Sequence, residues 1–187
     1  MRLRSPFQWI ADSAGRPALS ISILATLALL VTLDALGAPL RTAEAPAGIV
    51  SFEFAGSLVA ARQMIESWGD TGRVFAGLNL GLDYLFLLAY PFSIGLACSM
   101  VSSRLRGRRG DLSSLGIALA WGQGVAGLLD AVENYSLIRV LLGTRFESWP
   151  TVARISATGK FALVALGLIY LLFALVAGRL WEQSVPE

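Results

Sequence analysis

Four long apolar stretches constrain the fold of this chain more than any short motif does. They lie near residues 17–39, 74–102, 112–141 and 152–178. Each is long enough to cross the hydrocarbon core of a bilayer, which takes about 20 residues in an α-helix. A helix satisfies its backbone hydrogen bonds within its own segment, as lipid requires. The sequence therefore predicts an all-α integral membrane protein, an antiparallel bundle of four transmembrane helices.

Composition supports a membrane protein and excludes several other classes. The 187 residues are 55% hydrophobic and 15% charged, whereas soluble domains carry about 25% charged residues. The net charge of +2 and its distribution do not suggest nucleic acid as a partner. There is no histidine, and Cys98 is the only cysteine, so we expect no disulfide within the chain, no cofactor and no metal site of the zinc, copper or haem type. A hard, oxygen-liganded cation stays open.

The arginines set the expected orientation in the bacterial inner membrane. Arg2, Arg4 and Arg16 precede the first span, and the link SSRLRGRRGD joins the second span to the third. The positive-inside rule places both in the cytoplasm, so both termini are inside. A secretory signal is the alternative for the first span. The expected organisation is a cytoplasmic segment 1–16, spans 17–39, 73–102, 112–142 and 152–179, an extracytoplasmic cap 40–72, a basic loop 103–111, an outer loop 143–151 and a tail 180–187.

The cap (40–72) shows two patterns. In GIVSFEFAG, Val50, Phe52 and Phe54 alternate with polar residues, which predicts a short strand. SLVAARQMIESWG has helical periodicity, with Ser57 able to cap its start and Gly69 its end. We interpret the cap as a lid over the bundle, with Glu53 directed inward. A surface-lying amphipathic helix is the alternative.

Ionisable residues recur at one depth in the four spans. Asp34, Asp83, Asp130 and Lys160 each lie 18 to 21 residues from the cytoplasmic charge of their own span, which is roughly 27 to 32 Å of helix. All four should therefore lie near the outer edge of the apolar slab, with Glu133 and Asn134 one turn further out. Either these residues mark the boundary and glue the helices together, or they form a site.

Helical spacing predicts that these side chains converge. Asn79, Asp83 and Tyr90 share one stripe of the second span, as do Gln123, Gly127, Asp130 and Asn134 of the third. Pro91 removes one backbone hydrogen bond and should leave the carbonyl of Leu87 free. Four carboxylates then face Lys160, the only lysine of the chain, so at least one of them should keep its proton.

Four quoted segments carry a family resemblance. With FEFAGSLVAARQMIESW, LDYLFLLAY, LLDAVEN and GKFALV in this order, the chain resembles small four-helix bacterial integral membrane proteins that are uncharacterised. The resemblance covers about residues 18 to 180 and implies four spans in a bacterial inner membrane, without an activity. The DxxEN element also resembles integral-membrane sterol isomerases and terpenoid cyclases. Those families often use histidine and further aromatic residues that this chain lacks, so no catalytic role is carried over.

Three functional interpretations follow. In the first, a site near the outer face binds membrane lipid or a hydrophobic, amphipathic small molecule, or the chain is a homo-oligomer or a subunit of a membrane complex. In the second, it is an acid–base isomerase or cyclase acting on an isoprenoid or lipid, with Asp130 or Glu133 as acid, Asp83 as base and Lys160 as stabiliser. In the third, the carboxylates carry protons or a cation. The candidate ligand-binding residues are Asp34, Glu53, Asn79, Tyr84, Tyr90, Trp121, Gln123, Asn134 and Lys160.

Overall fold

The described part of the chain consists of helices joined by short loops and contains no strand. The computed structural model describes residues 5–105 and 110–182. Its elements are α1 (Gln8–Gly37), the 3-10 helix η1 (Ala38–Leu40), α2 (Ile49–Glu53), α3 (Leu58–Leu105), α4 (Gly110–Leu141) and α5 (Trp149–Glu182). Four of these helices are long and apolar enough to cross a membrane.

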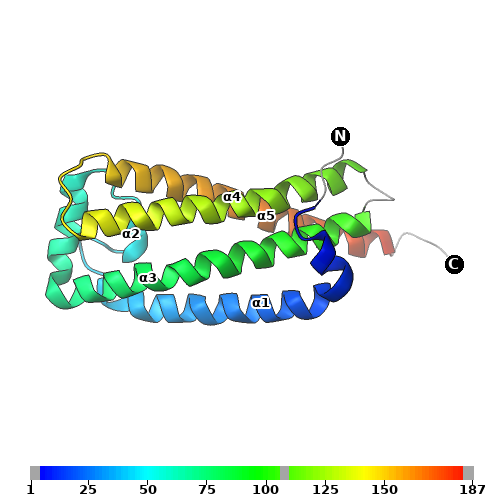
Figure 1. The fold of residues 1–187 in the computed structure, drawn as a ribbon, viewed down its shortest axis with the longest axis horizontal. Helices are drawn as coiled ribbons and strands as arrows, with labels where there is room; N and C mark the ends of the chain where they lie inside the picture. The colour runs from blue at the N-terminus through cyan, green and yellow to red at the C-terminus, as the bar shows by residue number, and fades with distance from the viewer. Residues whose placement is uncertain (1–4, 106–109, 183–187) are drawn as a thin grey trace.

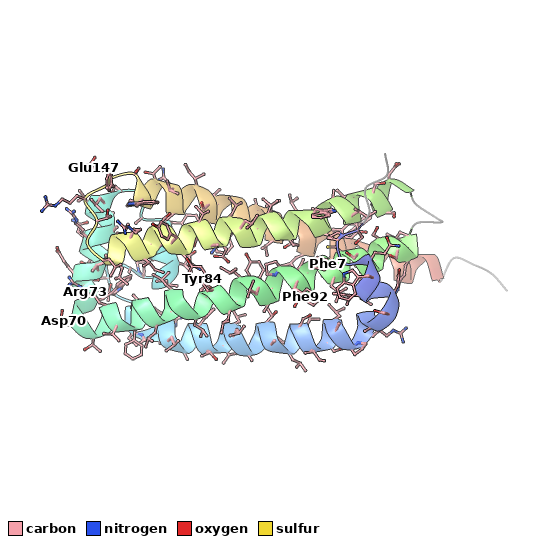
Figure 2. The ribbon with its side chains drawn as sticks, in the orientation of Figure 1. Phe7, Asp70, Arg73, Tyr84, Phe92 and Glu147 are labelled. Carbon is pink, nitrogen blue, oxygen red and sulfur yellow. The ribbon has the colours of Figure 1, made fainter. Side chains whose placement is uncertain are left out.

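The four long helices lie side by side along the long axis of the molecule (Figure 1). α3 packs against α1, α4 and α5, and α4 packs against α5. The start of α1 and the end of α5 lie at one end of the molecule, while α2 lies at the other (Figure 1). Side chains mark the same two ends: Asp70, Arg73 and Glu147 lie at the α2 end, and Phe7 and Phe92 near the opposite end (Figure 2).

Breaks in the long helices occur where the residues favour them. α1 starts nine residues before the predicted span and is interrupted at Ala14, whose φ of −144° is not helical. The break puts Pro17 in the first turn of the segment that follows, where its missing N–H costs no hydrogen bond. α3 is interrupted at Gly69, whose φ of +63° lies in the left-handed region that glycine tolerates. The amphipathic helix of the cap and the second span are therefore successive segments, 58–68 and 70–105.

The amphipathic helix of the cap forms as predicted. The Ala60 N–H donates to Ser57 Oγ at 3.2 Å, so Ser57 caps the start of the helix. Leu58, Ala61, Ile65 and Trp68 are all buried. They join Leu40 and Phe52 in an apolar cluster that also contains the adjoining turns of α3, α4 and α5. The Phe52 and Trp68 rings meet edge to face at 5.2 Å, and the Trp68 indole N–H donates to the Leu40 carbonyl at 2.8 Å.

The predicted strand is wrong, because residues 49–53 form the short helix α2. No second strand lies beside this segment to receive its backbone groups, so a helical turn satisfies them locally. The Ser51 N–H donates to the Gly48 carbonyl at 3.1 Å, and the Ala47 N–H donates to Ser51 Oγ at 2.9 Å. Phe52 and Glu53 are consequently buried, whereas Val50 and Phe54 are both 41% exposed.

Candidate functional site: a buried carboxyl–lysine cluster

The centre of the site is an ion-paired trio from α4 and α5. Lys160 Nζ donates to Asp130 Oδ1 at 2.7 Å and to Glu133 Oε1 at 2.9 Å. Asp130 and Glu133 are three residues apart and therefore share one face of α4. All three side chains are buried: Asp130 is 1% exposed, Glu133 0% and Lys160 7%.

α3 adds a third carboxylate beside this trio. Asn134 Nδ2 donates to Asp83 Oδ2 at 2.6 Å, and the Asp83 carboxyl also interacts with that of Asp130. The buried Tyr90 hydroxyl, about two turns further along α3, faces Asp130. α3 and α4 thus bring together the polar stripes that helical spacing predicted.

The fourth carboxyl group comes from the cap. Glu53, at the end of α2, is 9% exposed, and its side chain is hydrogen-bonded to that of Glu133. Two ionised carboxylates have no proton to share, so one member of this pair is protonated. Burial raises the pKa of Glu53 from 4.5 to about 7; Lys160 lowers this pKa, and Asp83 and Asp130 raise it. We call Glu53, Asp83, Asp130, Glu133, Asn134 and Lys160 the carboxyl–lysine cluster.

The cluster contains more negative groups than positive ones. Within the described residues, Lys160 is the only cation that forms an ion pair with any of the four carboxyl groups, and it pairs with those of Asp130 and Glu133. Arg73, Arg139 and Arg154 stand five to ten residues along the chain from the nearest of these cluster residues. All three are exposed and make no such pair. No nitrogen or hydroxyl group of the protein donates a hydrogen bond to Glu53 Oε2 or Glu133 Oε2. The proton that the two carboxyl groups share is their one donor, so this arrangement favours an additional donor.

Three predicted site residues serve helix packing rather than the cluster. Asn79 Nδ2 donates to the Leu33 carbonyl of α1 at 2.8 Å, and Gln123 Nε2 donates to the Leu163 carbonyl of α5 at 2.9 Å. Tyr84 lies between α3 and α4 (Figure 2), where its hydroxyl donates to the Ala131 carbonyl at 3.3 Å. Each holds two helices together through a backbone carbonyl, so their predicted place among ligand-binding groups is not supported by their contacts.

Asp34 and Trp121 point away from the cluster. α1 packs chiefly on α3 and leaves much of its surface exposed, and the Asp34 side chain is 67% exposed and paired with Arg41. Trp121 is 52% exposed on the outer surface of α4. Equal depth along a span does not fix the direction of a side chain around the helix axis, which is why Asp34 was wrongly grouped with Asp83, Asp130 and Lys160.

Sequence reasoning missed an aromatic pair at the edge of the cluster. Phe161 lies 5.0 Å from Lys160 Nζ, measured to the ring centroid, and its ring stacks on Phe54 at 6.0 Å. Both rings are more than 40% exposed. Phe161 follows Lys160 in the chain, but nothing in the sequence indicates that Phe54 would leave the apolar core of the cap to meet it.

Among the described residues, no group of three or more carboxylate or cysteine side chains has the arrangement of a metal site. No protein-family model matches the chain, and no curated protein or solved structure matches it either.

Proposed function

We propose that the chain is a multi-pass protein of the bacterial inner membrane whose carboxyl–lysine cluster binds the polar head group of a lipid-like or amphipathic small molecule. The observation that carries this proposal is the pair of buried oxygens, Glu53 Oε2 and Glu133 Oε2, to which no nitrogen or hydroxyl group of the protein donates a hydrogen bond. Buried polar groups are hydrogen-bonded in almost all proteins. The helix-packing residue Asn79, by contrast, donates its amide nitrogen to a backbone carbonyl of α1.

The surroundings of the cluster suit an amphipathic ligand. Phe54 and Phe161 offer exposed aromatic surface directly beside Lys160. A head group that donates hydrogen bonds would occupy the cluster, while an apolar tail would lie along these rings and the adjoining lipid. Ligand sites of this kind combine an apolar lining with a few convergent polar groups.

The proposed orientation follows from the basic residues. Arg16, near the start of α1, and Arg104, in the last turn of α3, line one pocket, and the start of α1 lies at the end of the molecule opposite α2 (Figure 1). Under the positive-inside rule that end is cytoplasmic and both termini are inside. The four spans would then form an antiparallel bundle, with the cap and the cluster near the periplasmic surface.

Native mass spectrometry of the protein purified in mild detergent tests the proposal. We expect a co-purified amphiphile of defined mass that is lost from Glu133→Gln and Asp130→Asn. Asp34→Asn, which removes an exposed carboxylate, is the matched control and should retain the ligand. Folded variants that hold the same amphiphile as the wild type would contradict the assignment of the site, and the absence of any ligand from well-folded wild type would contradict the function.

The same experiment distinguishes binding from catalysis. If the wild type holds one mass and Asp130→Asn accumulates a different, precursor mass, the protein converts its ligand and the acid–base interpretation replaces simple binding. Equal masses in all variants that retain ligand support binding alone.

A further inference from the structure

The two oxygens without donors belong to one contact between the cap and α4. Glu133 uses Oε1 to accept a hydrogen bond from Lys160 at 2.9 Å, whereas its Oε2 has no donor. Glu53 Oε2 has none either, and the two side chains are hydrogen-bonded to each other. The two carboxyl groups are therefore joined by a shared proton, and a charged donor in its place would make stronger hydrogen bonds to both.

Charge makes a cation the most favourable replacement for that proton. Glu53 is faced by Asp83 of α3, by Asp130 and Glu133 of α4, and by Lys160 of α5. Two further cations lie at the ends of α2, where Arg154 packs against Gly56 and Arg41 against Gly48, but neither pairs with these carboxyl groups. One ammonium among four carboxyl groups leaves room for a second positive charge.

The position of α2 makes it the element that would admit a ligand. It is five residues long and packs across α3, α4 and α5. Gly48 precedes it and Gly56 follows it, both with left-handed φ values of +61° and +68°. Glycine at both ends lets a short segment change its direction at low steric cost.

We propose that a cationic head group, such as a primary ammonium on an apolar tail, binds between Glu53 and Glu133 and replaces the proton that they share. This inference rests on the proposed function and specifies the class of head group. The ammonium donates one hydrogen bond to each Oε2, both carboxyl groups become ionised, and the displaced proton passes to solvent. Charge-assisted hydrogen bonds of this kind are roughly twice as strong as neutral ones.

The exchange predicts the direction of the pH dependence. The pKa of Glu53 is raised to about 7, chiefly by burial, so below that pH Glu53 carries a proton of its own, which the amine must displace in addition to the shared one. The apparent affinity should therefore rise as the pH is raised through about 7. An alkylamine has a pKa near that of lysine, about 10.4, and stays charged throughout this range.

Binding of matched amphiphiles to the full chain in phosphatidylcholine nanodiscs tests the inference. The probes are dodecylamine, dodecanol and dodecanoate, measured by isothermal titration calorimetry against empty nanodiscs. We expect dodecylamine to bind at least roughly tenfold more tightly than dodecanol, with dodecanoate weakest. In weakly buffered solution, amine binding should release more protons at pH 6, where Glu53 is protonated, than at pH 8.5, where it is ionised before the amine binds.

Each outcome separates this inference from the proposed function. If dodecanol binds as tightly as dodecylamine, or if no proton is released at pH 6, the cation inference fails while ligand binding stands. If no probe binds beyond the empty nanodisc, both fail. Glu53→Gln should abolish the pH dependence and weaken amine binding, whereas Glu66→Gln, an exposed site on α3, should behave as wild type. Should Glu53→Gln misfold, the wild-type comparison of amine with alcohol decides.

Discussion

Lys160 is the residue whose surroundings differ most from those of an ordinary membrane-facing side chain. Its ammonium group is buried and donates to carboxylates at two positions of α4. Neutralising one partner of a buried ion pair leaves the other charge without compensation, which is costly in an environment of low dielectric constant. Lys160 thus links α5 to α4 at the level where the cap covers the bundle.

Replacing Lys160 by methionine should lower the free energy of unfolding by about 3–5 kcal/mol, because Asp130 and Glu133 would lose their common cation. Chemical unfolding in detergent measures the change. Arg139→Met, which removes an exposed cation from α4, is the matched control and should change stability little.

The double variant Lys160→Met with Glu133→Gln checks that the loss comes from stranded charge. Removing one of the two carboxylates should restore part of the lost stability, as a double-mutant cycle would record. Unchanged stability in Lys160→Met, or no recovery in the double variant, would mean that the pair contributes little.

At the scale of elements, α3 and α4 approach closely at one place where a glycine of α4 packs on a proline of α3. Pro91 has no N–H, so the Leu87 carbonyl loses its helical donor, yet α3 keeps helical backbone angles through this turn. Gly127 of α4 packs directly on this place: a Cβ there would lie 3.1 Å from the Leu87 carbonyl oxygen and 3.3 Å from Pro91 Cγ. The helices approach closely where small residues allow it.

Gly127→Ala should therefore destabilise the packing of α3 on α4 by about 1–3 kcal/mol through overpacking. Gly124→Ala is the control on the same helix, because its Cβ would meet nothing within 4 Å; alanine there should be neutral or slightly stabilising, since it favours helix by up to about 1 kcal/mol. Thermal unfolding of both variants in the same detergent gives the comparison. Equal melting temperatures would show that α3 and α4 separate easily at this point.

The sequence predicts the long helices and their buried faces, but not the conformation of short segments or the rotation of each helix about its axis. Long apolar runs specify the four helices, and period 3.6 specifies which face of 58–68 is buried, because both signals depend on many residues. The segment 49–53 is too short for its hydrophobic period to distinguish a strand from a helix. A strand would need a partner strand for its backbone hydrogen bonds, and the sequence does not show whether one is present. Spacing along α3 and α4 brought Asp83, Asp130 and Asn134 together, but the sequence holds no signal for the rotation of α1 that turns Asp34 outward.

At the scale of the whole molecule, the proposed topology predicts which positions are reached from outside the cell. Cys98 is fully buried, so the wild-type chain should not react with a membrane-impermeant maleimide. Two exposed positions should be labelled in intact spheroplasts: Glu44→Cys, in the cap between η1 and α2, and Glu147→Cys, at the α2 end of the molecule (Figure 2). Ser13→Cys, exposed near the start of α1, should be labelled only after permeabilisation. Labelling of Ser13→Cys from outside would reverse the orientation.

The apolar cluster beneath the cap joins Phe52 and Trp68 to outer turns of α3, α4 and α5. In the proposed orientation this cluster faces the periplasm, where water drives apolar groups together, whereas helices within the bilayer associate by close packing without that drive. Assembly would then proceed in two stages, with the spans meeting first in lipid and the cap closing afterwards from the aqueous side. Urea weakens the apolar contacts formed in the second stage. A low concentration of urea would therefore unfold the cap and expose the carboxyl–lysine cluster to water while the four spans remain inserted.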